Sequence, residues 1–332
     1  MIRVFITGEE GFIGRNLKRY AQPGVDVISG IHSENDEAAF VSQYSTDKHE
    51  PCIHRNDEDA WQAFFEVNSI DVVIHNAAVV GTDVVALNSK ESTLTNVQGT
   101  YNICRAAKKA GIPVCYIGTT VIYDTQSYQE HVITEGDNRR PTTLYGCQKL
   151  CSEDIIKSQT DKWMIVRPLF AYGGEGDMNS LIAKTIYSAL NNKEQIDMFL
   201  DPHKVKDYMH VSDFCRGVWT CIIEELWGTD WNIASENPYT TWEIVKIIED
   251  VIRRDVSNVI KWHPQTDYLG NHKLSSRKLK LATGWEPQIS LRAGIKMSYE
   301  SIINSKNYNP LTHLEEAEDR DIDLTEYFPD IQ

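Results

Sequence analysis

The sequence lacks several features by which broad classes of protein are recognised. Positive charge is scarce, since 33 lysines and arginines stand against 48 aspartates and glutamates, which gives a net charge of -15. Nucleic acids and anionic membranes repel such a chain, so we expect it to bind neither. Long apolar runs are also missing, and none approaches the length of a membrane span. A strand pattern that begins at Arg3 leaves no room for a signal peptide, which predicts a cytoplasmic protein.

Cysteines and histidines occur without the spacings of disulfide or metal sites. The seven cysteines are odd in number and include no CxxC pair, a pattern that favours free thiols in a reducing compartment. The later histidines are scattered rather than set at ligand spacing, namely His203, His263, His272 and His313. We therefore expect no metal site.

What the chain does contain is an alternation of short apolar runs and amphipathic stretches. Runs rich in Val and Ile, typical of buried strands, lie at residues 3–7, 25–29, 71–76, 114–118 and 164–167. The amphipathic stretch 96–110 predicts a helix between two of them. This alternation predicts an α/β protein with a Rossmann-type, doubly wound parallel sheet, which binds ligands at the carboxyl ends of its strands.

Glycines follow the first predicted strand at a regular spacing. Residues 7–15 read TGEEGFIGR, with glycines at Gly8, Gly11 and Gly14. Glycine allows a tight turn and lets a pyrophosphate approach the start of a helix, where backbone amides and the helix dipole hold negative charge. Glycines in this position, between a first strand and a helix, predict a dinucleotide-binding site.

Tyr145 and Lys149 lie four residues apart, so they share one face of a predicted helix. The lysine ammonium can then lower the pKa of the tyrosine, and a phenol that titrates nearer neutrality can act as an acid or base. Alone, such a pair is ordinary on a protein surface. Its position about one strand–helix unit after Thr119 makes it a candidate catalytic pair.

With these motifs in this order, the chain resembles the extended short-chain dehydrogenase/reductases. These are NAD(P)-dependent epimerases, dehydratases and reductases that act mostly on nucleotide sugars. The resemblance runs from Val4 to about Gly294. It rests on TGEEGFIG at 7–14, HNAA at 75–78, NVQGT at 96–100, GTTVIY at 118–123, the Tyr145/Lys149 pair, VRP at 166–168 with YG at 172–173, KDYMHVSD at 206–213 and GWEP at 284–287.

The resemblance implies a role for each matching position. Tyr145 would be the acid/base, Lys149 would bind the nicotinamide ribose and tune Tyr145, and the hydroxyl of Thr119 would hydrogen-bond the substrate oxygen. Besides Tyr145 and Lys149, the implied cofactor contacts are Gly8, Gly11, Phe12, Ile13, Gly14, Arg15, Ser29, His32, Ala77, Ala78, Asn96 and Pro168. The implied substrate contacts are Val80, Thr120, Phe170, Lys206 and Asp207.

The end of the second predicted strand departs from the pattern of NAD-preferring members, which place a carboxylate there for the ribose hydroxyls. Here Ser29 or Gly30 stands at that position. Without the carboxylate a 2′-phosphate is not repelled, and Arg15, Ser29 and His32 can donate hydrogen bonds to one. The sequence therefore favours NADP over NAD. In the alternative, Asp26 or a later residue serves the ribose and NAD is used.

Three further departures concern the substrate. Thr120 and Val121 stand where the 4,6-dehydratase branch has Asp-Glu, so we do not expect dehydration. Phe170 replaces an Asn that meets the substrate phosphates in many members. Lys206 replaces an Arg that clamps the pyrophosphate, and lysine lacks the bidentate fork of arginine. The last two changes weaken the case for a standard nucleotide sugar without removing it.

The chain divides into three predicted regions. Residues 1–172 form the NAD(P)-binding Rossmann domain with the catalytic pair. Residues 173–309 form a smaller mixed α/β region that mainly binds substrate, with helices at 180–191 and 241–253, some segments that return to the first domain, and Trp242, Trp262 and Trp285 in its core. Residues 310–332 are an acidic tail, either solvated or docked through its last apolar residues.

These observations predict an NAD(P)-dependent oxidoreductase or epimerase that acts on a nucleotide sugar by hydride transfer, with Tyr145 as acid/base. An epimerase and a reductase would use the same residues, so both stay open. One alternative is an NADPH-dependent reductase of a non-nucleotide carbonyl compound, motivated by Phe170 and Lys206. Another is a catalytically silent cofactor-binding regulator, against which the intact Tyr145 and Lys149 argue. The resemblance also implies a homodimer formed through the 96–110 helix and the helix of Tyr145.

Overall fold

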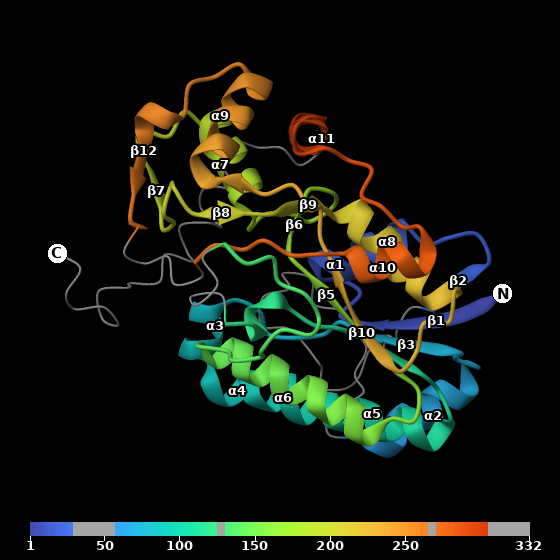
Figure 1. Cartoon of the computed structure of the whole chain (residues 1–332). Helices are drawn as coiled ribbons and strands as arrows, with labels where there is room; N and C mark the ends of the chain where they lie inside the picture. Colours follow the sequence, from blue (N-terminus) through green and yellow to red (C-terminus); the bar gives the residue numbers. More distant parts are fainter. Residues whose placement is uncertain (29–56, 125–129, 265–269, 305–332) are drawn as a thin grey trace, which may run out of the picture.

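The sheet at the centre of the molecule has six strands. A computed structural model describes residues 1–28, 57–124, 130–264 and 270–304. The strands lie in the order β10-β5-β4-β3-β1-β2, and every pairing is parallel (Figure 1). Their bounds are Ile2–Thr7 (β1), Val25–Ile28 (β2), Val72–His75 (β3), Val114–Ile117 (β4), Trp163–Pro168 (β5) and Thr229–Ile233 (β10). The predicted fold class is thereby confirmed.

The strand order reverses next to β1. The chain passes from β1 to β2 on one side and then places β3 on the other side of β1. In doubly wound sheets such a reversal opens a crevice at the carboxyl ends of the two strands, and ligands bind there. The turns that follow β1 and β3 are therefore the place to look for a site.

The edge strand β10 was not predicted from the sequence. Its residues read TDWNI, in which Asp230 and Asn232 interrupt the apolar run that marks the other strands. The structure nevertheless pairs it with β5 along its whole length. Both polar side chains take part in a network of hydrogen bonds inside the molecule, which is why they are tolerated here.

Helices cover both faces of the sheet (Figure 1). On one face lie α2 (Glu58–Val67), α5 (Thr100–Ala110) and α6 (Leu144–Gln159), and Phe65 of α2 is buried there with Phe5 of β1. On the other face lie α1 (Phe12–Arg19), α8 (Val211–Ile223) and α10 (Arg277–Thr283). Trp219 of α8 fills this second core and donates to the Leu17 carbonyl at 3.1 Å.

The helix predicted at 96–110 begins earlier and in a different form. A π-helical turn, Leu94–Gly99, precedes α5, and the short helices α3 (Thr82–Leu87) and α4 (Ser89–Thr93) come before it. Within the π turn the Asn96 carbonyl accepts hydrogen bonds from the hydroxyls of Thr100, at 2.6 Å, and Ser152, at 2.7 Å. Side-chain hydroxyls therefore satisfy the Asn96 carbonyl within this π-helical turn, which is wider than an α-helix.

A second group of elements lies beyond the carboxyl ends of the strands (Figure 1). Three two-stranded ribbons pair β6 (Phe170–Tyr172) with β9 (Tyr208–His210), β7 (Ile196–Met198) with β12 (Ile260–Trp262), and β8 (Val205–Lys206) with β11 (Tyr239–Thr240). Around them α7 (Leu181–Leu190), α9 (Thr241–Ile252) and α11 (Leu291–Asn304) enclose a separate core. The helices predicted at 180–191 and 241–253 are confirmed as α7 and α9.

Two of the three tryptophans assigned to the core of this smaller region lie elsewhere. Trp285 is buried in the core between the sheet and α8, because the chain returns to the sheet with α10. Trp242 is 39% exposed at the start of α9. The boundary predicted at residue 172 stays a prediction, and α8 and β10 beyond it belong to the central sheet. Among the described helices, none has the length and apolar character of a membrane span.

Candidate active site

The turns after β1 and β3 touch each other through glycine. Gly8 has a φ of +67°, and a Cβ added to it would stand 2.9 Å from the Cα of Ala77. A Cβ on Gly14 would collide with the Gly8 carbonyl oxygen. Larger residues therefore do not fit at these two positions. The predicted glycines and Ala77 are brought together at the point where the strand order reverses.

The start of α1 is open to an anion. Gly11 occupies the N-cap position, no side chain caps the helix, and its first turn contains no acidic residue. The first backbone amides and the helix dipole are thus available to a negatively charged group. The glycine cradle beside them leaves room for close approach, so these residues fit the pyrophosphate of a dinucleotide.

A buried chain of hydrogen bonds connects β1, β3 and the π turn. The Thr100 hydroxyl donates to the Asn96 carbonyl, so it accepts from Nε2 of His75 at 2.9 Å. Nδ1 of His75 then accepts from the Thr7 hydroxyl at 2.8 Å, whose oxygen receives the amides of Asn76 and Ala77. Burial, with a smaller effect of Lys149, lowers the pKa of His75 to about 3, which agrees with a neutral ring in this tautomer.

Asn96 holds the loop that follows β3. Its side chain accepts from the Val79 amide at 2.8 Å and donates to the Val79 carbonyl at 2.9 Å. It also donates to Oε1 of Gln148 on α6 at 2.8 Å, and the Gln148 amide donates to the hydroxyls of Ser92 and Thr93. The side chain of Asn96 therefore positions the 77–80 loop, and its predicted contact with cofactor stays a prediction.

Tyr145, Lys149 and Thr119 meet at the carboxyl end of β4. The Thr119 hydroxyl lies close enough to that of Tyr145 to lower its pKa slightly. Lys149 is 2% exposed; its Nζ donates to the Ile117 carbonyl at 2.7 Å and lies 4.2 Å from the centre of the Tyr116 ring. A Cβ on Gly146 would stand 2.9 Å from the Val121 carbonyl oxygen, so this glycine lets α6 approach the Thr119 turn closely.

Burial decides the ionisation of this pair. It raises the pKa of Tyr145 to about 12, against a smaller lowering by the Thr119 hydrogen bond. It lowers the pKa of Lys149 to about 7, against the attraction of Glu153. Loss of hydration dominates the pKa of Tyr145 and Lys149 is not among the causes of the shift, so the expectation that Lys149 lowers this pKa stays a prediction.

The other predicted cofactor residues lie around the crevice. Phe12 and Ile13 are partly buried against the core under α1, and Pro168 ends β5. Arg15 forms an ion pair with Glu10 at 3.3 Å, so its charge already has a neighbour of opposite sign. Ser29 and His32, the other two residues predicted to meet a 2′-phosphate, lie outside the described residues.

The predicted substrate residues divide into two groups. Phe170 stacks on Tyr208 with ring centres 5.2 Å apart, and Nζ of Lys206 donates to the Gly270 carbonyl at 2.8 Å. Asp207 is buried and accepts from Ser235 and the Glu236 amide, and burial raises its pKa to about 6. Thr120 is buried next to Thr119, whereas Val80 is 60% exposed. Contact of these residues with substrate stays a prediction.

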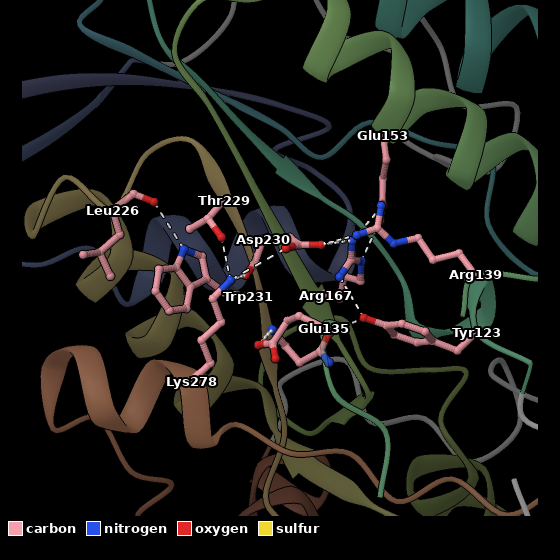
Figure 2. Close-up of polar contacts among 11 residues, drawn as sticks. Tyr123, Glu135, Arg139, Glu153, Arg167, Leu226, Thr229, Asp230, Trp231 and Lys278 are labelled. Carbon is pink, nitrogen blue, oxygen red and sulfur yellow. Dashed lines mark hydrogen bonds and ion pairs between the residues drawn. The ribbon is translucent and has the colours of Figure 1, made fainter. Parts of the chain in front are cut away.

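A buried ion pair that was not predicted from the sequence lies near Tyr145 and Lys149. Glu153 and Arg167 have side chains that are 0% exposed, and Nε and Nη2 of Arg167 each donate to a different Glu153 oxygen at 2.8 Å. Glu153 points from α6 toward Arg167 on β5, and Asp230 approaches from β10 (Figure 2). Two features of the sequence could have indicated this ion pair. Glu153 follows Lys149 by one helical turn, and Arg167 is a charged residue inside an apolar strand. Within the described segments, no group of three His, Cys, Asp or Glu side chains could hold a metal ion.

Comparisons with known proteins find similarity along most of the chain. A dTDP-glucose 4,6-dehydratase of Haemophilus influenzae is 23% identical over 90% of this chain and 97% of its own length. UDP-glucuronic acid decarboxylase 4 of Arabidopsis thaliana is 22% identical over 90% of this chain and 68% of its own. Among solved structures, RMD of Pseudomonas aeruginosa complexed with NADPH has a TM-score of 0.76 at 18% identity, covering 90% of this chain and 98% of that one. A UDP-glucose 4-epimerase of Thermus thermophilus with NAD also has a TM-score of 0.76, at 19% identity and with 92% and 100% covered.

The comparisons also correct one expectation. Dehydration was not expected because Thr120 and Val121 replace an Asp-Glu pair, yet 4,6-dehydratases stand among the relatives beside decarboxylases. That exclusion is not supported, because similarity along most of the chain outweighs one dipeptide. The family profile described as "NAD dependent epimerase/dehydratase family" matches residues 4–234, more than half of the sequence. The chain therefore belongs to the NAD-dependent epimerase/dehydratase family.

Proposed function

We propose that this protein is an NAD(P)-dependent enzyme that acts on a nucleotide sugar through hydride transfer, with Tyr145 as acid/base. One observation carries the proposal: Tyr145 and Thr119 are neighbours at the carboxyl end of β4, with the Lys149 ammonium held by the Ile117 carbonyl at 2.7 Å. The glycine cradle lies in the neighbouring crevice of the same sheet edge. A polar substrate between the two would meet both a proton donor and the cofactor.

The cofactor would lie along the crevice between β1 and β3. Gly8, Gly11 and Gly14 would hold its pyrophosphate at the start of α1, and Lys149 would meet the nicotinamide ribose. When bound, the nicotinamide supplies or accepts the hydride. Similar solved structures are complexes with NADPH or NAD, which supports a cofactor of this class. We keep NADP as the favoured one, with Arg15 as the described residue that would meet its 2′-phosphate.

Tyr145 would move the proton of the reacting oxygen. Because its pKa is raised to about 12, the phenol is protonated at neutral pH and can donate to the oxygen of a carbonyl as that carbonyl is reduced. Thr119 would hold the same oxygen in place. The negative charge left on Tyr145 is stabilised by the Lys149 ammonium, which acts only while that lysine is protonated.

A nucleotide sugar is the substrate class best supported by the relatives. Their names specify dTDP-glucose, UDP-glucuronic acid and UDP-glucose. One specific observation keeps a second candidate, a non-nucleotide carbonyl compound. Lys206 is buried and donates to the Gly270 carbonyl, although this position was expected to clamp the substrate pyrophosphate. Thermal shifts with UDP, GDP, CDP and dTDP separate the two, since only a nucleotide site is stabilised by them.

The test of the proposal is a Tyr145→Phe variant assayed against a panel of nucleotide sugars for reduction, epimerisation, decarboxylation and loss of water. We expect cofactor binding to be retained and turnover to fall by at least ~100-fold, since the proton donor is gone. Tyr299→Phe is the matched control, because Tyr299 is a half-buried tyrosine of α11 that packs against the core of the smaller region. Near-normal turnover of Tyr145→Phe would overturn the assignment.

We also propose that two copies of the chain associate through α5 and α6. The outer side of α6 supports this, since Leu144 is 41% exposed and a hollow of about 580 Å³ is lined by Leu150, Cys151 and Ile155. Apolar side chains that remain exposed on a helix favour burial against another surface.

A further inference from the structure

Glu153 lies on the buried side of α6, one turn after Lys149. Arg167 binds both of its oxygens, through Nε at 2.8 Å and Nη2 at 2.8 Å. A bidentate pair of this kind sets the position as well as the charge of the carboxylate. Since both side chains are fully buried, neither can rotate away without leaving an unpaired charge inside the protein.

Arg167 is itself held from the other side (Figure 2). Its Nη1 donates to the Tyr123 hydroxyl at 2.8 Å, and its Nη2 also donates to Asp230. Asp230 has further cations of its own, Arg139 at 2.7 Å and Lys278 at 3.7 Å. Arg139 and Lys278 thus compensate the charge of Asp230, and the guanidinium of Arg167 stays paired with Glu153.

The pair lies directly under the turn that carries Thr119. A Cβ on Gly118 would stand 3.0 Å from Oε1 of Glu153 and 3.1 Å from Cγ of Arg167. A side chain at this position would press on both members of the ion pair. Glu153 therefore contacts the segment that leads into Thr119 while it shares a helix face with Lys149.

Lys149 faces few other groups that titrate. In the described part of the chain these are His75 from β3, Tyr116 from β4, and Tyr145 and Glu153 from its own helix. His75 is neutral because its pKa lies near 3, and burial raises the pKa values of Tyr116 and Tyr145, so both phenols are neutral as well. Glu153 is the anion among them.

We propose that Glu153 is a positioning residue for the reaction: fixed by Arg167 one helical turn from Lys149, its carboxylate keeps the Lys149 ammonium charged while the Ile117 carbonyl holds that ammonium in place. The inference rests on the proposed function of Tyr145 and Lys149. Arg167 reduces the effect of Glu153 on Lys149, because its hydrogen bonds to Glu153 neutralise part of the negative charge of that carboxylate. Asp230, on the far side of Arg167, contributes to the stability of the cluster without acting on Lys149.

The test follows the titration of Lys149 itself in the full-length protein labelled with ¹⁵N-lysine. The Nζ resonance is assigned by its loss in Lys149→Arg and is followed against pH by NMR. In Glu153→Gln we expect the pKa of Lys149 to fall by ~1 unit or more, since the attraction of the carboxylate is lost. Asp230→Asn is the matched control; it also removes one carboxylate from Arg167, and we expect the titration to stay where it is.

A third variant separates positioning from simple loss of stability. Arg167→Lys keeps the cation but cannot bind both oxygens, so Glu153 is less neutralised and the pKa of Lys149 should rise. This rise in the pKa of Lys149 still tests the proposal if circular dichroism shows that Glu153→Gln does not fold. Equal shifts in Glu153→Gln and Asp230→Asn, or a fall in Arg167→Lys, would overturn the proposal.

The outcome is distinguishable from failure of the proposed function. The lysine titration needs neither cofactor nor substrate, so it reports on Glu153 alone. Binding of NADPH and NAD to the same samples is then measured by fluorescence between pH 6 and pH 9. A wild-type protein that binds neither would refute the proposed function and leave the role of Glu153 in the titration standing.

Discussion

At the scale of the residue, burial moves the pKa values of Tyr145 and Lys149 in opposite directions. That of Tyr145 rises to about 12 and that of Lys149 falls to about 7, so both groups are uncharged over the intervening range. The ammonium that would stabilise a charged Tyr145 is therefore present only at the lower end of physiological pH. This makes the acid/base step sensitive to the protonation of the lysine.

Reductive turnover is expected to decline as pH rises through the pKa of Lys149, about 7, because the neutral amine no longer stabilises the deprotonated Tyr145. Lys149→Arg keeps a positive charge across this range, since guanidinium does not titrate there. We expect its turnover to be lower overall but without the decline at alkaline pH. The measurement is a pH–rate profile of both proteins, and the same alkaline limb in both would rule Lys149 out as its cause.

Cofactor choice is a second prediction at this scale. Arg15→Gln should weaken the binding of NADPH by ~10-fold or more, since it removes a charged hydrogen-bond donor to the 2′-phosphate. The affinity for NADH should be unchanged. Arg19→Gln is the control, because Arg19 lies on the same helix and pairs with Glu175 instead. Fluorescence titration with both cofactors decides the matter, and an equal loss for the two would assign Arg15 a role outside 2′-phosphate recognition.

At the scale of the element, α6 is fixed on two sides by buried polar contacts. Gln148 joins it to Asn96 and the α4 end, and Glu153 joins it to β5. The sequence predicted the strands, the glycine loop and the Tyr145/Lys149 face, because these follow from local spacing. It did not predict Gln148 or Glu153 as structural partners, since their partners lie 52 and 14 residues away and become neighbours only in the folded sheet.

The close contact between Gly14 of α1 and the Gly8 carbonyl, in the turn after β1, gives a prediction about this helix. A methyl group at Gly14 collides with the Gly8 carbonyl, so Gly14→Ala must displace the start of the helix. We expect a loss of about 1–3 kcal/mol in the free energy of unfolding, as in other overpacked sites, together with weaker cofactor binding. Gly136→Ala is the control, because its nearest atom, Thr134 Oγ1, would be 3.9 Å away. Urea denaturation and cofactor titration check both, and a variant with wild-type values would show that the cradle is not rigid.

At the scale of the whole molecule, the parts of the fold that local patterns could not predict are those that link the two regions. The interrupted pattern of β10 hid an edge strand, and the return of the chain with α10 carried Trp285 back to the sheet. Both depend on segments more than 50 residues from Tyr145 and Lys149 in sequence. Residues Ser29 and His32, and the acidic tail predicted at 310–332, lie outside the described residues.

The proposed homodimer is a prediction at this scale. Light scattering should give twice the chain mass of 37.9 kDa. Leu144→Glu together with Ile155→Glu places two charges on the outer side of α6 and should shift the mass toward the monomer, since an unpaired charge is costly in an interface. Leu281→Glu, on α10 at a position 75% exposed, is the control. A wild-type mass at the monomer value would refute the association.

The edge strand β10 also limits how this protein can be taken apart. A fragment ending at residue 172 would lack β10 and α8, which contribute Asp230 and Trp219 to the interior. The apolar side of the sheet would then face water, and Arg167 would keep only part of its partners. The first 172 residues are therefore not a transferable module. Elements of the sheet core (α8, β10 and α10) alternate along the chain with elements of the other core (α7, α9 and α11), so no single crossover exchanges one region between relatives.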